Sequence, residues 1–210
     1  MKIIPTVFAK TKKEFNEDFK KILPISKNIQ IDFMDGKFVK AKSIQLKNIP
    51  NLKKYNKNFE AHLMVLHPER HIKKLEQKGF KKIFFHFEST KSPEKIIEKI
   101  KPFKVAAGIA FNPKTPLSQI LRIKDRADII LLMGHTPGIE GAPLNKKVLE
   151  KIKKLRKLDK KIKIQVDGAV NDKTILKLKR AGVNYVNIGS FISSSNKPRQ
   201  TLKILREKIK

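Results

Sequence analysis

Residues 29–39 read IQIDFMDGKFV, a pattern typical of a β-strand that ends in a tight turn. Apolar residues alternate with Gln30 and Asp32, so both polar side chains point to the same face of the strand. Asp35 and Gly36 follow, and this pair is typical of a turn. Burying two polar side chains costs free energy unless they are paired or bind a ligand, so this face is a candidate functional surface.

The same β-type pattern recurs along the chain, and each run is followed by a stretch with helical spacing. Residues 68–79, PERHIKKLEQKG, illustrate the helical pattern, with Pro68 near the start and Gly79 at the end. We therefore expect eight strands, each followed by a helix. The expected strands are residues 3–8, 29–33, 59–65, 82–87, 104–111, 129–133, 162–167 and 184–188.

Alternating strands and helices predict an α/β fold with a single domain over residues 1–210. Eight such units favour a single (β/α)8 TIM barrel. A doubly wound open sheet is the alternative, but it usually has fewer strands and often a glycine-rich first turn, whereas residues 9–11 read AKT. In a TIM barrel the functional residues lie where the strands end and the following loops begin.

The composition is typical of a globular protein, with 40% hydrophobic residues. The longest apolar runs, such as IILLM at residues 129–133, are far too short to span a membrane. The first residues, MKIIPTVFAKTKKEF, lack the continuous apolar core of a signal peptide. The absence of cysteine excludes disulfides, thiolate metal ligands and a cysteine nucleophile. We expect a cytoplasmic protein without a membrane segment.

The net charge of +30 arises from 49 Lys and Arg against 19 Asp and Glu. A basic nucleic-acid-binding scaffold is one interpretation, since clustered cations bind a phosphate backbone. Only seven of these cations are Arg, the residue that makes bidentate phosphate and base contacts, and the lysines are spread over every expected helix. A solvated basic surface is therefore favoured, with nonspecific polyanion binding at low salt.

Polar and sulfur-containing side chains recur at the carboxyl ends of the expected strands. Taken singly, each has a structural explanation, because a lone histidine is often a hydrogen-bonded core residue and a methionine often fills the core. Their convergence at one end of a barrel favours a functional site instead. The residues are Asp32, Met34, Asp35, His62, Met64, His86, Glu88, Asn112, Met133 and Asp167, with Gly168, Gly189 and Ser190 in the turns after the last two strands.

Seven segments, in order along nearly the whole chain, resemble the ribulose-phosphate 3-epimerase family. The resemblance implies a TIM barrel that interconverts D-ribulose 5-phosphate and D-xylulose 5-phosphate, a reaction of the pentose phosphate pathway. The segments are IDFMDGKFV (31–39), HLMV (62–65), FHFE (85–88), NPKTP (112–116), MGHTPGIEG (133–141), VDGAV (166–170) and IGSFI (188–192).

The resemblance implies that Asp32 and Asp167 transfer protons on opposite faces of the substrate. It also implies a divalent metal, either zinc, iron, manganese or cobalt, held by Asp32, His62 and Asp167, with Gln30 as a candidate fourth ligand. The residues expected to line the site are Met34, Met64, Met133 and His86.

The phosphate of a ketose phosphate is expected to lie against the turns after the last two strands. Small residues there allow backbone N–H groups to approach phosphate oxygens closely. The loop at residues 137–141, PGIEG, resembles the flexible cover of the family's site, and a homo-oligomer is expected. The expected substrate- or phosphate-binding residues are Gly138, Gly141, Gly168, Ala169, Gly189 and Ser190.

Four positions depart from the family pattern: Gln30 replaces a metal-binding histidine, Ala9 a serine, Ala142 a glutamine and Ala169 a glycine. A glutamine offers a weaker, neutral oxygen, so we expect a loosely held metal, unless His135 or water takes the vacant ligand position. A barrel that binds a sugar phosphate with lost or altered epimerase chemistry is the alternative function.

Overall fold

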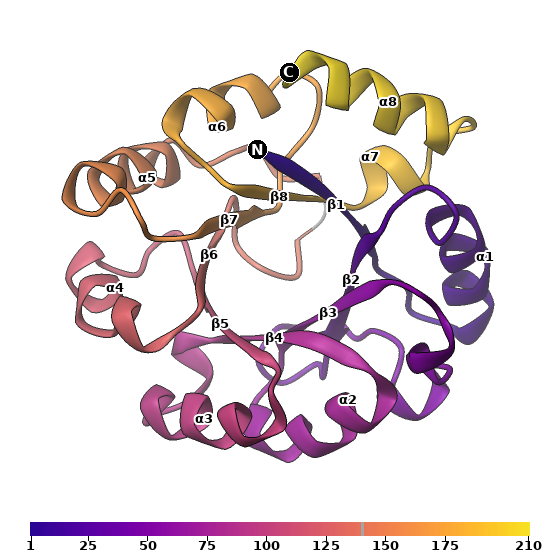
Figure 1. The fold of residues 1–210 in the computed structure, drawn as a ribbon, viewed down its shortest axis with the longest axis horizontal. Coiled ribbons are helices and arrows are strands. Elements are labelled where there is room, and N and C mark those ends of the chain that lie inside the picture. Colours follow the sequence, from indigo (N-terminus) through magenta and orange to yellow (C-terminus); the bar gives the residue numbers. More distant parts are fainter. Residues whose placement is uncertain (140) are drawn as a thin grey trace.

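The computed structural model describes residues 1–139 and 141–210. Eight parallel strands form a closed barrel in which each strand pairs with its neighbours in chain order and β8 returns to β1 (Figure 1). This confirms the predicted (β/α)8 TIM barrel and excludes an open doubly wound sheet. The strands are β1 (Lys2–Val7), β2 (Asn28–Met34), β3 (Asn58–Met64), β4 (Phe80–His86), β5 (Ala106–Phe111), β6 (Ile129–Met133), β7 (Ile164–Asp167) and β8 (Tyr185–Ile188).

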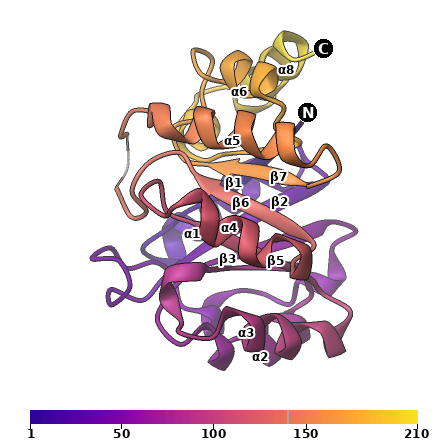
Figure 2. The ribbon, with the colours of Figure 1, turned by 90° about the vertical axis from the view of Figure 1, so that its left-hand side faces the viewer.

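The helices form an outer ring around the strands (Figures 1 and 2). Their boundaries follow the capping signals of the sequence: α1 begins with a Thr11–Glu14 capping box, and α2 and α6 end at glycines with left-handed backbone. The helices are α1 (Lys12–Ile22), α2 (Ile72–Lys78), α3 (Pro93–Ile100), α4 (Leu117–Ile123), α5 (Lys146–Leu158), α6 (Ile175–Ala181), α7 (Ser190–Ser193) and α8 (Pro198–Lys208).

The prediction of a helix after every strand is wrong for β2. The segment between β2 and β3 contains only short 3₁₀ turns at Leu46–Asn48 and Leu52–Lys54. Pro50 cannot donate within a helix, and the Asn51 side chain accepts a hydrogen bond from the backbone N–H of Lys53, which fixes a local turn. This segment packs against the outside of the barrel through Ile44, Ile49 and Leu52 without forming a regular helix.

Apolar packing occurs in two places. The larger core lies between the strands and the surrounding helices and includes Phe15, Phe59 and Phe80. A smaller cluster lies inside the barrel on β4, β5 and β6, with Phe84, Ala110, Ile129, Leu131 and Met133 as its members. The inward positions of the other strands carry buried polar side chains, which include Thr6, Gln30, Asp32, Glu60, His62, Gln165, Asp167 and Asn187.

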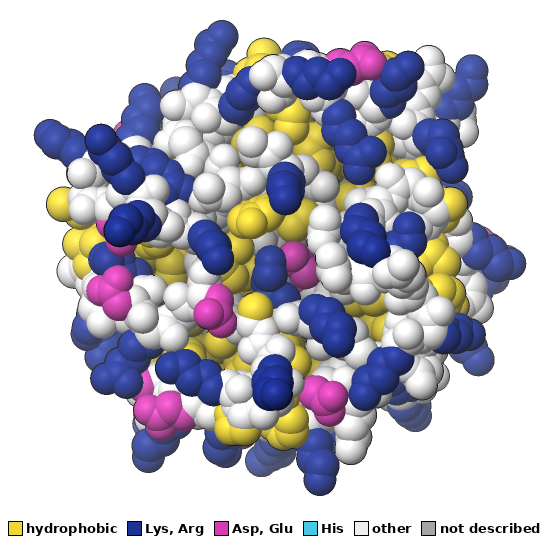
Figure 3. All heavy atoms as spheres, in the orientation of Figure 1, with side chains coloured by type: hydrophobic (Ala, Val, Ile, Leu, Met, Phe, Trp, Pro, Cys, Tyr) yellow, Lys and Arg dark blue, Asp and Glu magenta, His cyan; other side chains and the backbone are white. Residues whose placement is uncertain are grey.

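Lys and Arg side chains cover the face shown in Figure 3 without gathering into a single stripe. This agrees with the spread of lysines over all the helices in the sequence. Within the described residues, every helix is too short or too polar to cross a membrane.

Candidate active site

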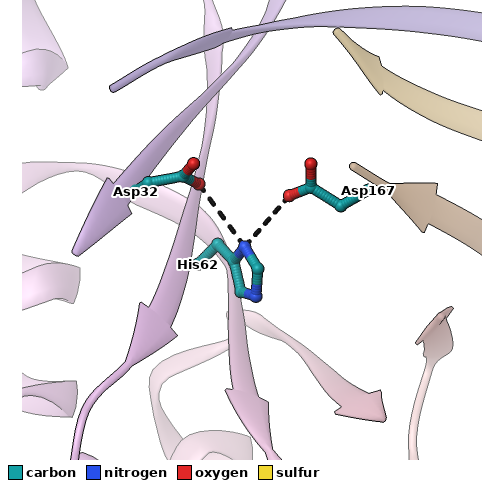
Figure 4. Close-up of side chains that lie close together, drawn as sticks. All are labelled: Asp32, His62 and Asp167. Carbon is teal, nitrogen blue, oxygen red and sulfur yellow. Dashed lines mark ion pairs between the residues drawn. The ribbon is translucent and has the colours of Figure 1, made fainter. Parts of the chain in front are cut away.

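Asp32, His62 and Asp167 meet at the carboxyl ends of β2, β3 and β7 (Figure 4). The His62 Nδ1 atom lies 3.4 Å from Asp32 Oδ1 and 3.0 Å from Asp167 Oδ2. The three side chains are buried, and their potential ligand atoms all lie within 4.8 Å of one another. The structure therefore brings together the three residues expected to hold a metal.

Gln30 lies between the two carboxylates. Its Nε2 atom donates hydrogen bonds to Asp32 Oδ1 at 2.9 Å and to Asp167 Oδ2 at 2.6 Å. The opposite amide orientation would place an oxygen against two carboxylate oxygens, so the donor assignment follows from charge. Gln30 thus bridges, through its amide group, two residues that are far apart in the sequence.

The donor set fits a divalent cation. The His62 Nδ1 contacts to the carboxylates lack hydrogen-bond geometry, and this nitrogen and Gln30 Oε1 are buried without a hydrogen-bond partner in the described chain. An imidazole nitrogen with two carboxylates is a common combination for first-row transition metals. Asp32, His62 and Asp167 could therefore hold such an ion. Gln30 turns its NH₂ group toward the carboxylates, so its Oε1 would join these ligands only after the amide rotates.

The two carboxylates have pKa values displaced in opposite directions. Burial and the negative charge of Asp167 raise the pKa of Asp32 to about 6. Burial also acts to raise the pKa of Asp167, but contact with His62 and the Gln30 amide outweighs it and lowers that pKa. Burial acts to lower the pKa of His62, yet the two carboxylates raise it to about 9. Such a separation suits one carboxylate to act as an acid and the other as a base.

His86 does not line the cavity, contrary to the sequence-based expectation. It is fully buried behind His62, with the two Nε2 atoms 3.0 Å apart, and its Nδ1 lies 3.4 Å from Glu88 Oε2. Glu88 in turn accepts hydrogen bonds from the backbone N–H of Asn112 and the hydroxyl of Thr115. Burial lowers the pKa of His86, so a neutral His86 supports the ring of His62 from behind.

A cavity of about 810 Å³ opens above the carboxylates. Asp32 and Asp167 belong to its wall, as do Met34, Met64 and Met133, whereas Gln30 and His62 lie beneath the wall and are fully buried. The six expected phosphate- or substrate-binding residues also line the cavity: Gly138, Gly141, Gly168, Ala169, Gly189 and Ser190. Residue 140 of the expected cover loop lies outside the described residues.

The turn after β7 packs closely against the loop after β6. Gly168 has φ +91°, and a Cβ there would lie 2.8 Å from His135 Nε2. His135 therefore covers this turn, and its Nδ1 contacts the carbonyl oxygen of Thr136 at 2.8 Å. Ala169 adopts φ +57°, a left-handed conformation that glycine adopts at lower cost.

Among the cavity residues that sequence reasoning missed are Thr6 on β1 and Asn187 on β8. Each is at most 2% exposed, and Thr6 Oγ1 and Asn187 Nδ2 have no hydrogen-bond partner in the part of the chain that the structure describes. Strand alternation gives only a partial signal, because it tells which residues of one strand share a face. The pairing of Thr6 with Gln30 and of Asn187 with Asp167 is seen only in the structure. Ala9, where the resemblance places a serine, packs in the outer core instead, and Ala142 lines the cavity.

Comparison with known proteins agrees with this geometry. Residues 2–193 match the Ribulose-phosphate 3 epimerase family. The chain is 29% identical to the ribulose-phosphate 3-epimerase of Schizosaccharomyces pombe, over 99% of this chain and 93% of that protein. It is 28% identical to the cytoplasmic isoform of Oryza sativa subsp. japonica, over 86% of this chain and 82% of that protein.

A solved structure shows the same fold. The 3-hexulose-6-phosphate synthase of Salmonella typhimurium superposes with a TM-score of 0.74 at 14% identity, over 100% of this chain and 98% of that chain. At this identity the likeness extends to the barrel alone. The match over residues 2–193 is more specific, and the chain belongs to the ribulose-phosphate 3-epimerase family.

Proposed function

We propose that this chain is a ribulose-phosphate 3-epimerase, an isomerase that interconverts D-ribulose 5-phosphate and D-xylulose 5-phosphate. The observation that carries the proposal is the pair of carboxylates, Asp32 and Asp167, on the wall of one cavity with pKa values displaced in opposite directions. Epimerisation beside a ketone needs such a pair, because a proton leaves one face of the carbon and returns to the other.

Asp167 and Asp32 each transfer one of the two protons in the proposed reaction. Asp167, whose pKa is lowered, is ionised and takes the proton from the carbon beside the ketone. The electron pair of the broken C–H bond moves toward the ketone and gives an enediolate. Asp32, whose pKa is raised, delivers its proton to the same carbon from the opposite face. The reverse reaction exchanges the two roles.

Asp32, His62 and Asp167 would hold a divalent cation, either zinc, iron, manganese or cobalt. When bound, such an ion supplies Lewis-acid stabilisation of the negative charge that develops on the substrate. Gln30 Oε1 is the only fourth protein donor that we propose, and a neutral amide oxygen binds these ions less well than imidazole. We therefore propose that the ion is loosely held and easily lost during purification.

The substrate's phosphate binds at the turns after β7 and β8 in this proposal. Gly168, Ala169, Gly189 and Ser190 line the cavity there, and a Cβ at Gly189 would come no closer than 3.9 Å to its neighbours. That space allows oxygen atoms to approach the backbone amides. Gly138 and Gly141 belong to the covering loop, and the three methionines exclude water from the reacting carbon.

A direct assay tests the proposal. The protein is incubated with D-ribulose 5-phosphate in deuterated water, with and without added manganese, cobalt or zinc, and D-xylulose 5-phosphate and deuterium uptake are measured. Product formation with deuterium at the epimerised carbon is expected, and stronger with added metal. Failure of both product formation and deuterium exchange at every metal would contradict the proposal.

A second candidate function is a sugar-phosphate-binding barrel with lost or altered epimerase chemistry. The observation that favours it is the Gln30 amide, which contacts both carboxylates at hydrogen-bond distance. Calorimetric binding of the sugar phosphate without deuterium exchange is the result expected for this candidate.

Four broader expectations also remain proposals. We propose that residues 1–210 act as one domain, that the protein forms a homo-oligomer, and that it works in the cytoplasm.

The dispersed cations support weak, nonspecific polyanion binding that disappears at physiological salt. Light scattering, cell fractionation and binding to two unrelated DNA sequences over a salt series test these points. Sequence-selective binding at physiological salt would favour the nucleic-acid scaffold instead.

A further inference from the structure

A chain of polar contacts crosses the interior of the barrel beneath the proposed active site. Lys82 Nζ on β4 lies 2.6 Å from Glu60 Oε1 on β3, and Gln165 Nε2 on β7 donates to Glu60 Oε2 at 2.9 Å. The same Gln165 Nε2 donates to Asn187 Oδ1 on β8 at 2.7 Å. The chain of contacts therefore runs from a partly buried ion pair to a residue on the cavity wall.

These contacts fix the orientation of the Asn187 amide. The Glu60 carboxylate can only accept, so Gln165 must turn its NH₂ group toward it. That NH₂ group also faces Asn187, which must therefore present its oxygen to Gln165 and its own NH₂ group elsewhere. The result is an oriented donor, Asn187 Nδ2, without a hydrogen-bond partner among residues 1–139 and 141–210.

The free donor belongs to the wall of the cavity that holds the two carboxylates. Asn187 is only 1% exposed, yet it lines this cavity together with Asp32 and Asp167. It is paired with Asp167 across the β7–β8 ladder, so the two side chains are neighbours on the inner face of the barrel. A buried donor without an acceptor costs free energy, and this cost is recovered when a bound molecule supplies the acceptor.

We propose that Asn187 is a further substrate-binding residue, whose Nδ2 donates a hydrogen bond to an oxygen of the ketose chain beside Asp167. This inference rests on the proposed function and deepens it. The phosphate is assigned to the backbone of the turns at 168–169 and 189–190, which leaves the neutral side-chain donor for a carbonyl or hydroxyl oxygen. Gln165 acts as a positioning residue, because it reaches the substrate only through Asn187.

Isothermal titration calorimetry with two ligands tests the inference. Xylitol 5-phosphate carries the sugar-like hydroxyl chain and cannot react at a ketone, whereas inorganic phosphate carries only the anion. Asn187→Leu, which keeps the shape but removes the donor, should weaken xylitol 5-phosphate binding about tenfold and leave phosphate binding at its parental level. Asn58→Leu, the same exchange at the exposed amino end of β3, is the control and should bind both ligands as the parent does.

Asn187→Asp covers the case in which the leucine variant does not fold. The aspartate keeps an acceptor for Gln165 but cannot donate to the ligand. Its added negative charge weakens both anionic ligands, so xylitol 5-phosphate binding should fall more than phosphate binding in the same variant. Equal weakening of both ligands, unchanged xylitol 5-phosphate binding, or no binding of this ligand to the parent would each overturn the inference. If the parent does not epimerise ribulose 5-phosphate, the proposed function fails, while a selective loss in these titrations still supports the role of Asn187.

Discussion

The two halves of the barrel interior differ in chemistry. On β4, β5 and β6 most inward side chains form an apolar cluster that includes Phe84, Ala110 and Leu131, with Lys82 and His86 of β4 as polar exceptions. On β1, β2, β3, β7 and β8 they are mostly polar. Several polar atoms of this second half have no partner in the described structure: Thr6 Oγ1, Gln30 Oε1, His62 Nδ1, Gln165 Oε1 and Asn187 Nδ2.

The difference shows how one barrel separates stability from chemistry. In the apolar half, burial and close packing stabilise the folded protein without a bound ligand. The polar half is costly in the unliganded protein, because buried donors and acceptors without partners have lost their hydrogen bonds to water. A ligand that supplies those partners recovers the cost, so the polar half is suited to binding and the apolar half to holding the fold.

The largest expected effect is on turnover, from substitutions in the polar half. Asp32→Asn and Asp167→Asn should each lower the rate of epimerisation by a factor of about 10² to 10⁴, because each removes a proton carrier. Solvent-deuterium uptake should fall in parallel, while circular dichroism shows an intact fold. Asp125→Asn, at an exposed carboxylate far from the cavity, is the matched control. Near-parental turnover in either site variant would mean that the two-base assignment is wrong.

Leu131→Ala in the apolar half should show the opposite behaviour. Leu131 is fully buried, so the cavity left behind should lower the free energy of unfolding by about 2–5 kcal/mol. Turnover per folded molecule, measured well below the unfolding temperature, should stay near the parental value. Urea unfolding measures the stability, with Leu158→Ala, at a side chain 62% exposed, as the control. A loss of turnover without a loss of stability would contradict the assignment of stability to the apolar half and of catalysis to the polar half.

The metal-free protein should become less stable as the pH rises. The pKa of His62 is raised from 6.5 to about 9, so its contribution is complete below about pH 6.5 and is lost as the pH rises through 9. The raised pKa of Asp32 acts in the same direction at lower pH. With about 1.4 kcal/mol per pKa unit, the free energy of unfolding should fall by about 2–3 kcal/mol between pH 6.5 and 9.

Urea unfolding in the presence of a chelator measures this pH dependence. His62→Gln should flatten it, because the titrating group is removed. A divalent cation should also flatten it, because the ion stabilises the deprotonated donors. A flat profile in the chelated parent protein would show that His62 does not take up the proton.

Gln30→His should increase cation affinity. An imidazole in place of a neutral amide oxygen should tighten zinc binding about tenfold or more, as measured by calorimetry. Gln45→His, at an exposed position in the loop after β2, controls for nonspecific binding by an added histidine. Equal affinity in the Gln30 variant and the parent, or tight stoichiometric metal in the parent, would contradict the loose-metal proposal.

The smallest expected effect lies in the turn after β7. Ala169 has φ +57°, so Ala169→Gly should relieve strain and raise the free energy of unfolding by about 0.5–1 kcal/mol. Ala142→Gly, at a position whose φ is not left-handed, should give no such gain. Thermal unfolding separates the two variants, and an equal response would show that the Ala169 backbone is not strained.

Local patterns were sufficient to predict the strands and the convergence of Asp32, His62 and Asp167. Strand alternation is readable within a few residues, and the carboxyl ends of parallel strands share one end of the barrel. The helix expected after β2 does not form, because Pro50 cannot donate within a helix and the Asn51 side chain fixes a local turn. The strands, the positions of their ends and the loop after β2 all depend on residues that are close together in the sequence.

The remaining features depend on neighbours in space. Whether His86 lines the cavity or lies behind His62 depends on how two rings from adjacent strands pack. Which end of the Asn187 amide is free depends on Gln165 and on a carboxylate from the opposite side of the barrel. The sequence of one strand cannot predict the orientation of the Asn187 amide, because contacts among four strands, β3, β4, β7 and β8, determine it.

The polar half of the barrel has a consequence for the order in which the chain is synthesised. Its strands come from both ends of the sequence, β1 to β3 at the start and β7 and β8 near the end, whereas the apolar half comes from the middle. Until β7 emerges from the ribosome, Gln30 and Glu60 remain without their partners Asp167 and Gln165. Asn187 meets Gln165 only when β8 follows and pairs with β1. The active site is therefore expected to form at the last step of folding, when β8 pairs with β1 and closes the barrel.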